Sequence, residues 1–132
     1  MQKRPVSKVV LDSSALIALV NQEPGFEQVE AVLQDAVISA VNFAEVVAKY
    51  TKRGLPPDIV RSEVDAFRIE VVPFDRAQAT MAGLLRFSTS RLGLGIGDRS
   101  CLALGLVMAL PVMTADRVWA RLKAGVEVIL IR

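Results

Sequence analysis

The stretch VVLDSSAL, residues 9–16, decides how the rest of the chain folds. It begins with three apolar residues, two of them β-branched, which predict a short strand buried on both faces, as in the inner strands of a parallel sheet. An acid, Asp12, ends this strand, and helix formers follow from Ala15 onward. In open α/β sheets the working site lies beyond the carboxyl ends of the strands. Asp12 is therefore the first candidate for a functional residue.

Short apolar runs typical of strands alternate with segments of helical spacing along the whole chain. The predicted strands are 8–11, 36–39, 69–72, 111–114 and 127–131, and the predicted helices are 15–20, 26–33, 42–53, 58–67, 76–87, 98–109 and 117–123. This alternation predicts a three-layer α/β/α sandwich with a central, mostly parallel five-stranded sheet, in one domain over residues 1–132. Residues 88–97, rich in Ser and Gly, are predicted to form a mobile loop.

The composition excludes several classes of protein. Hydrophobic residues make up 52% of the 132, too many for a disordered chain, yet no apolar run approaches the ~20 residues of a membrane span. The chain has no histidine, which excludes Ser-His and Cys-His hydrolases and His-ligated zinc. The single cysteine, Cys101, lies in an apolar helical run and is predicted to be an inert core thiol. The net charge of +2 is too small to indicate nucleic-acid binding by itself.

The amino terminus superficially resembles a secretory signal, because Lys3, Arg4 and Lys8 precede a mostly apolar run that reaches Val20. Asp12 lies in the middle of that run, where a signal peptide tolerates an acid badly, and no small-residue cleavage site follows. We therefore expect a cytoplasmic protein with no membrane segment.

Four acids are predicted to meet at one edge of the sheet. Asp12 ends the first strand, Glu45 lies in the first turn of the helix after the second strand, Asp98 opens the helix before the fourth strand, and Asp116 follows the fourth strand. Neighbouring strands lie ~4.8 Å apart, and two carboxylates ~4 Å apart repel by roughly 4 kcal/mol at an effective dielectric of 20. Such a cluster calls for a cation. Oxygen ligands without imidazole select Mg²⁺, with Mn²⁺ as a substitute, over zinc.

Each acid also has a purely structural interpretation. Asp12, Asp98 and Asp116 can cap the helices that follow them. Glu45 can form a capping box with Asn42 or pair with Lys49 one turn further on. Taken singly, each residue fits a cap better than a metal ligand. The cap positions nevertheless place all four at the same edge of the sheet, which favours the metal site.

Three other signals have structural interpretations. Asp75, in PFDRA, fits a helix cap after the third strand, which we expect to lie further from the four acids. Gly93, Gly95 and Gly97 lack the preceding strand and the spacing of a nucleotide-binding loop, so they indicate flexibility. Trp119, a lone aromatic at a helical position, is predicted to belong to the core or an interface.

The acids lie in four ordered blocks that together resemble a known family. The blocks are LDSSALIAL, SAVNFAEV, GDRSCLALG and TADRVW. They are similar in order and in residue pattern to those of the PIN-domain ribonucleases, most closely the VapC-type toxins of toxin-antitoxin pairs. The similarity extends over nearly the whole chain. The resemblance implies a metal-dependent endoribonuclease that is held inactive by a cognate antitoxin and is commonly a homodimer.

The resemblance also implies roles for individual residues. The acidic quartet of the family falls on Asp12, Glu45, Asp98 and Asp116, its hydroxyl after the first acid on Ser14, and its hydroxyl before the last acid on Thr114. The expected mechanism uses Mg²⁺ to activate a water for attack on an RNA phosphodiester. RNA contacts are expected from the cations that directly follow proposed ligands, Arg99 and Arg117. Further candidates, for which a solvated helix face is the alternative, are Arg86, Lys49, Lys52, Arg53 and Arg91.

Two other functions stay open on the residues alone. The first alternative is a catalytically silent interaction module, whose acids are helix caps and whose apolar surface binds a partner. The second alternative is a nuclease that acts on DNA, because the same cluster of acids would hydrolyse either backbone. The helix around Phe43 and Tyr50 and the stretch 15–20 carry apolar residues that serve equally well as core or as a face for an antitoxin or a second copy.

Overall fold

The computed structural model describes residues 8–132. Of the signal-like amino terminus, Lys3 and Arg4 lie outside the described residues. Across residues 8–132, no helix is long and apolar enough to cross a membrane.

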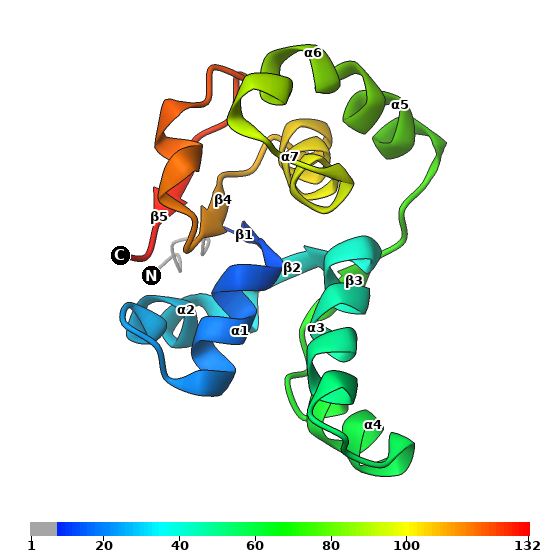
Figure 1. The fold of residues 1–132 in the computed structure, drawn as a ribbon. Coiled ribbons are helices and arrows are strands. Elements are labelled where there is room, and N and C mark those ends of the chain that lie inside the picture. The colour runs from blue at the N-terminus through cyan, green and yellow to red at the C-terminus, as the bar shows by residue number, and fades with distance from the viewer. Residues whose placement is uncertain (1–7) are drawn as a thin grey trace, which may run out of the picture.

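Strands and helices alternate along the chain (Figure 1). The strands are β1 (Val9–Leu11), β2 (Ala36–Ser39), β3 (Glu70–Val72), β4 (Val112–Thr114) and β5 (Val128–Leu130). The α-helices are α1 (Ser13–Asn21), α2 (Phe26–Val32), α3 (Ala40–Lys52), α4 (Pro57–Asp65), α5 (Arg76–Leu84), α6 (Arg86–Thr89) and α7 (Ile96–Met108). Three 3₁₀ turns complete the chain, η1 (Leu33–Asp35), η2 (Ser90–Leu92) and η3 (Arg117–Arg121).

The five strands form one sheet in the order β3-β2-β1-β4-β5, and all four pairings are parallel. The predicted parallel sheet is therefore confirmed. The chain builds outward from β1 to β3 on one side and then returns to place β4 on the other side of β1. Strand order thus reverses between β1 and β4, where a parallel sheet opens a crevice at its carboxyl edge.

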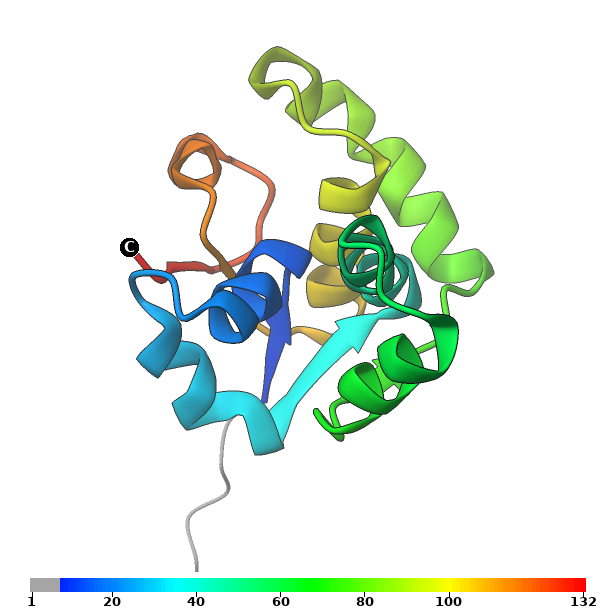
Figure 2. The ribbon, with the colours of Figure 1, turned by 60° about the horizontal axis from the view of Figure 1, so that its bottom comes forward.

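Side chains of each inner strand alternate between two apolar clusters, one on each face of the sheet. Val9 and Leu11 belong to the cluster covered by α1 to α4, and Val10 belongs to the cluster covered by α5, α7 and η3. Figures 1 and 2 show α5 beside α7, on the side of the molecule away from α1 and α2. The predicted three-layer sandwich is confirmed, because strands buried on both faces need helices on both faces.

Helices α3 and α7 both begin two residues earlier than predicted, which changes the position of an acid within each helix. Ser39 caps α3 by accepting a hydrogen bond from the Val41 amide at 3.2 Å, so Glu45 lies in the second turn of that helix and not the first. Helix α7 begins at Ile96, so Asp98 lies inside its first turn and is not the N-cap.

The prediction of a loop over residues 88–97 is wrong for its first half. The helix predicted over 76–87 breaks after Leu84, and α6 and η2 then continue as short helical turns to Leu92. Thr89 is fully buried and donates from Oγ1 to the Leu85 carbonyl at 2.7 Å, and Leu94 is also buried. These two buried side chains anchor a segment that its Ser and Gly content alone marks as irregular.

Candidate active site

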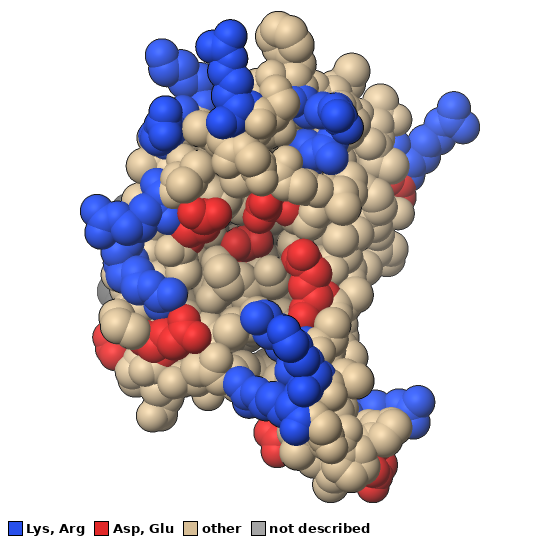
Figure 3. Space-filling model, in the orientation of Figure 1, with Lys and Arg blue, Asp and Glu red and all other residues tan. Residues whose placement is uncertain are grey.

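The four acids lie at the carboxyl edge of the sheet, around the point where strand order reverses. Asp12 follows β1 directly, and its amide donates to the Met113 carbonyl of β4 at 2.9 Å. Asp116 lies two residues beyond the end of β4, while Glu45 and Asp98 come from α3 and α7. Figure 3 shows a hollow at the centre of this face that contains acidic side chains, with Lys and Arg side chains on several sides of it.

Asp12 is 3% exposed and occupies the N-cap position of α1, yet its carboxylate caps nothing. Its Oδ2 instead accepts two hydroxyl hydrogen bonds, from Ser14 Oγ at 2.7 Å and from Thr114 Oγ1 at 3.0 Å. The cap interpretation therefore fails for this residue, because an N-cap side chain bonds a backbone amide of the first turn.

The two hydroxyls are themselves held in place by the backbone after β4. Ser14 Oγ accepts from the Ala115 amide at 3.0 Å, and Thr114 Oγ1 accepts from the Asp116 amide at 3.1 Å. A hydroxyl has one proton to donate, so accepting from an amide leaves that proton for Asp12. The network ties the end of β1 to the end of β4 and fixes the orientation of the Asp12 carboxylate.

Burial raises the pKa of Asp12 from 3.8 to about 6. The hydrogen bonds from Ser14 and Thr114 oppose this rise, since they favour the charged form, and the negative charges of Asp98 and Glu45 add to it. Removal from water is the largest of these causes. A cation beside the carboxylate would reverse the effect, because it stabilises the ionised form.

Asp98 and Asp116 are half-buried and each bonds a backbone amide of its own helix or turn. Asp98 Oδ2 accepts from the Gly95 amide at 3.1 Å, and Asp116 Oδ1 accepts from the Val118 amide at 3.1 Å. Burial raises the pKa of Asp98, the Gly95 bond opposes this, and the charges of Asp116 and Glu45 add to the rise. Both residues therefore do act as helix-start acceptors, but each uses only one carboxylate oxygen in this role.

Glu45 is the exposed member of the set. Its Oε1 accepts a hydrogen bond of 2.9 Å from the side-chain amide of Asn42, one turn earlier on α3. The predicted capping box is therefore wrong, because Ser39 and not Asn42 is the N-cap of the helix, and Glu45 accepts from the Asn42 side chain and not from a backbone amide.

A common pattern emerges from the four carboxylates. Each accepts hydrogen bonds on one oxygen, and the other oxygen has no partner among residues 8–132. The two ion pairs in the described part of the chain, Lys8 with Glu70 and Arg132 with Glu23, involve none of the four. Within residues 8–132, the four carboxylates at this edge of the sheet thus have no basic partner.

The donor set suits a hard cation, but the side chains do not form a closed cage around one. Within residues 8–132, no three acidic or thiol side chains converge closely enough to hold a metal ion as they stand. Carboxylate oxygens without imidazole or thiolate are the ligands that Mg²⁺ and Mn²⁺ prefer, and Mg²⁺ keeps several waters in its sites. The residues therefore fit a partly hydrated cation that a few of these oxygens hold.

The three predicted RNA-contacting arginines differ in their surroundings. Arg86 and Arg117 are exposed. Arg99 is partly buried, and its Nη1 donates to the Ala82 carbonyl of α5 at 3.2 Å, so its guanidinium packs on α5. Among the further candidates, Arg53 bonds the Asn21 side chain and lies over the Tyr50 ring.

A shallow cavity of about 240 Å³ leads away from the acids along α3. It is lined by Glu45, Ala48, Lys49 and Lys52, which places two exposed lysines within two turns of an acid of the set. Positive charge next to an acidic site is suited to the phosphates of a polyanionic substrate.

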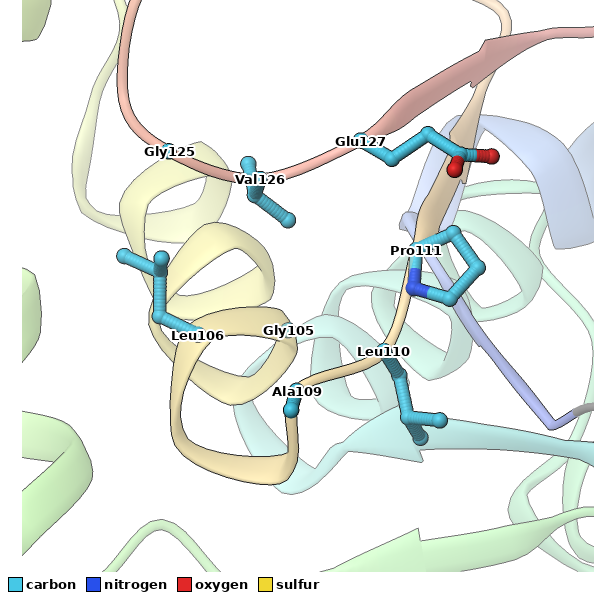
Figure 4. A pocket seen from close by; sticks show the side chains of 8 residues that line it. All are labelled: Gly105, Leu106, Ala109, Leu110, Pro111, Gly125, Val126 and Glu127. Atoms are coloured by element: carbon cyan, nitrogen blue, oxygen red, sulfur yellow. The ribbon is translucent and has the colours of Figure 1, made fainter.

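The larger cavity, of about 330 Å³, lies at the opposite end of the sheet (Figure 4). It is formed where α7 ends and where the chain enters β4 and β5, and Glu127 is the one charged residue in its lining. None of the four acids faces it. The amino ends of the strands thus offer space without the chemistry found at the carboxyl ends.

Three structural predictions are confirmed. Cys101 is fully buried, and burial raises the pKa of its thiol well above the usual value, so it is an inert core residue. Asp75 caps α5 by accepting from the Gln78 amide at 2.9 Å. Trp119 is fully buried in the core.

One contact at the site has no signal in the sequence. The Asn42 side chain, besides reaching Glu45, donates to the Gly97 carbonyl at 2.9 Å across a separation of 55 residues. The glycine-rich segment before α7 indicates flexibility from sequence, whereas Gly97 lies inside the first turn of α7 and packs against Glu45. Only the packing of α3 against α7 reveals this.

Comparison with solved structures identifies the fold. A VapBC complex bound to DNA from Salmonella typhimurium has a chain that superimposes with a TM-score of 0.75 at 22% identity, covering 96% of this chain and 100% of that chain. A chain of VapBC2 from Rickettsia felis, bound to promoter DNA, gives a TM-score of 0.72 at 19% identity, covering 92% of this chain and 96% of that chain. VapBC-5 of Mycobacterium tuberculosis, a toxin-antitoxin system, gives 0.64 at 25% identity over 95% and 99%.

A search of the curated proteins found no match. The family model of the PIN domain, however, matches residues 9–125, which is most of the chain and includes all four acids. The match agrees with the resemblance of the four sequence blocks and with the structural neighbours. The chain belongs to the PIN-domain family.

Proposed function

We propose that the protein is a Mg²⁺-dependent endoribonuclease and the toxin of a type II toxin-antitoxin pair. The observation that carries the proposal is the set of four carboxylates at the strand-order reversal. Among residues 8–132, each has one oxygen hydrogen-bonded, one oxygen free and no basic partner. Membership of the PIN-domain family and the VapBC neighbours support it. Residues 1–132 are proposed to form one nuclease domain, acting in the cytoplasm where its substrate and partner occur.

The proposed ligands are Asp12 and Asp98, with Glu45 and Asp116 acting directly or through water. When bound, Mg²⁺, or Mn²⁺ in its place, lowers the pKa of a water and neutralises charge that develops on a phosphate. Asp12 presents a fixed carboxylate, because two hydroxyls and two backbone amides determine its orientation. Ser14 and Thr114 are thus proposed to support the ligand without touching the cation.

The RNA backbone is proposed to cross the acidic hollow and continue over the basic side chains around it. Lys49 and Lys52 lie along the α3 cavity, and Arg86 and Arg117 are exposed. Arg99 stays a proposed RNA contact, and it would have to leave the Ala82 carbonyl to make one. Exposed cations that contact phosphates give salt-dependent affinity, so cleavage of long RNA is expected to weaken as salt rises.

A cognate antitoxin and a second copy of the chain are the proposed protein partners. The structural neighbours are toxin-antitoxin complexes, which supports the first. Large apolar side chains are exposed on α5, α6 and α7, with Phe87 at 93% and Leu84 at 69% exposure, which supports a protein interface of one kind or the other.

A cleavage assay tests the proposal. The wild-type protein, purified away from any co-expressed antitoxin, is incubated with an RNA and with a DNA of the same sequence, each with Mg²⁺ and with EDTA. Cleavage of RNA that needs the metal and disappears in Asp12→Asn supports the proposal. Cleavage of DNA alone would replace RNA by DNA as the substrate. Absence of both cleavage and Mg²⁺ binding would favour the silent interaction module.

A further inference from the structure

We propose that Asn42 and Gly97 are positioning residues, which hold the Glu45 carboxylate in one place against the first turn of α7. The inference deepens the proposed metal-dependent activity and rests on it. Glu45 is exposed and comes from a different helix than Asp98, so something has to set where its carboxylate lies relative to the other acids.

Asn42 provides the attachment. Its side chain is fully buried, and Nδ2 donates one proton to Glu45 Oε1 and the other to the Gly97 carbonyl, both at 2.9 Å. Both partners are acceptors, so only the amide nitrogen can face them, and this determines which way the side chain points. The amide thus links a side chain of α3 to the backbone of α7.

The same amide also carries a cost in stability. Within the described residues, Asn42 Oδ1 is buried and has no hydrogen-bond partner. A buried unpaired acceptor lowers stability, and an apolar side chain of similar size would avoid this. Such an apolar side chain, however, could not make the hydrogen bonds to Glu45 and Gly97.

Gly97 provides the space. A Cβ atom at this position would lie 2.8 Å from the Glu45 carboxyl carbon and 2.9 Å from Oε1, closer than real contacts allow. The backbone at Gly97 is helical, so conformation does not demand glycine there. The Glu45 carboxylate occupies the space that a side chain would take, and an alanine would push it away.

Two amides in the chain form a matched pair for the test. Gln78 is also buried, also donates to a backbone carbonyl, that of Pro73 at 2.9 Å, and also has an unpaired buried oxygen, but it contacts none of the four acids. Leucine is close in size to asparagine and methionine to glutamine. Asn42→Leu and Gln78→Met therefore impose similar structural changes, and only the first releases Glu45.

Mn²⁺ binding by calorimetry, without RNA, is the primary measurement, together with the melting temperature of each variant. Asn42→Leu is expected to weaken Mn²⁺ affinity 10- to 100-fold, as loss of a residue that orients a ligand does. Gln78→Met is expected to bind Mn²⁺ as wild type does, with a comparable change in melting temperature. Equal Mn²⁺ affinities for Asn42→Leu and wild type would overturn the inference.

A second pair of variants covers the case in which Asn42→Leu fails to fold. Gly97→Ala is expected to keep the melting temperature nearly unchanged, because only a flexible side chain has to move, and to weaken Mn²⁺ binding about as much as Asn42→Leu. Gly83→Ala, on α5 with open space around the new methyl group, is expected to bind as wild type does. Unchanged binding in Gly97→Ala would contradict the inference.

A double variant tests whether the two residues act through Glu45. In a Glu45→Gln background, Asn42→Leu and Gly97→Ala are expected to cause no further loss of Mn²⁺ affinity, because the group they position is already changed. Additive losses would mean that they act in another way. If wild type binds Mn²⁺ and Asp12→Asn does not, the proposed function stands whatever these variants do; if wild type fails to bind, both proposals fall.

Discussion

The two halves of the acidic site are built in opposite ways. Asp12 is buried just after a strand, and its carboxylate is held by one hydroxyl from the first turn of α1 and one from the end of β4. Glu45 is exposed on a helix, and its carboxylate is held by a single amide. Asp98 and Asp116 lie between these extremes, half-buried and bonded to a nearby backbone amide.

Under the proposed function, the two halves contribute differently to binding a cation. The buried half places a charge where water cannot stabilise it, so it gains most when a cation arrives. The exposed half is already solvated and gains less. We therefore expect substitutions in the buried half to lower activity more than those in the exposed half. Without metal, removing the buried charge is expected to raise the stability of the fold.

The largest expected effect is on catalysis. Asp12→Asn removes the charge of the central ligand and is expected to lower RNA cleavage by about 10³-fold or more, since a metal contributes several kcal/mol to such a reaction. Glu45→Gln is expected to cost distinctly less. Single-turnover cleavage rates at saturating Mg²⁺ measure both. Equal losses would remove the distinction between the two halves.

The pH dependence of stability is the next largest effect. Between pH 3.8 and about 6 the folded chain keeps a proton on Asp12 that the unfolded chain has released, so the free energy of unfolding falls as the pH rises. The total loss is about 3 kcal/mol, complete above pH ~7, since each pH unit between the two pKa values corresponds to about 1.4 kcal/mol.

Denaturant unfolding in EDTA measures this loss against Asp12→Asn, which lacks the ionisable group. The free energy of unfolding of the variant is expected to exceed that of wild type by an amount that grows from pH 4 to pH 7 and then stays constant. Saturating Mg²⁺ is expected to reverse the advantage, because it stabilises only the wild type. If the difference in free energy of unfolding between the variant and wild type does not change with pH, the pKa of Asp12 is not raised in the folded protein.

A smaller effect is expected from the hydroxyls that hold Asp12. Thr114→Val removes one hydrogen bond that favours the charged carboxylate, so the pKa of Asp12 is expected to rise further and Mg²⁺ affinity to fall 10- to 100-fold. Thr89→Val is the matched control, because Thr89 is also fully buried but donates to the Leu85 carbonyl, on α5–α6. The midpoint pH of Mg²⁺ binding is expected to increase only in the first variant.

The smallest expected effect separates a cap from a ligand. Asp75→Ala removes a true N-cap and is expected to lower the free energy of unfolding by about 1 kcal/mol while Mg²⁺ binding stays unchanged. In the metal-free protein at pH 7, Asp12→Asn is expected to change stability in the other direction. Thermal melts in EDTA compare the two, and a loss in both would restore the cap interpretation of Asp12.

Much of the fold was predictable because local pattern determines it. The five predicted strands all overlap the observed ones, since short β-branched runs buried on both faces have few other uses in a parallel sheet. Helix starts were less predictable, because they depend on which residue caps the backbone. Ser39 caps α3 and Gly95 precedes α7, and each choice moved an acid by about one turn or less.

The sequence by itself determined that four acids gather at one edge of the sheet, because the carboxyl ends of parallel strands and the starts of their helices share that edge. It also determined that the site contains no imidazole, since the chain has no histidine.

Only the tertiary structure decided how each acid is held. The bond from Thr114 to Asp12 spans 102 residues and the bond from Asn42 to Gly97 spans 55. Such contacts depend on how closely strand ends and helices pack, at a scale of a few ångström, and spacing along the chain does not specify distances that fine. The burial that raises the pKa of Asp12 arises in the same way, because neighbouring elements, and not neighbouring residues, exclude the water.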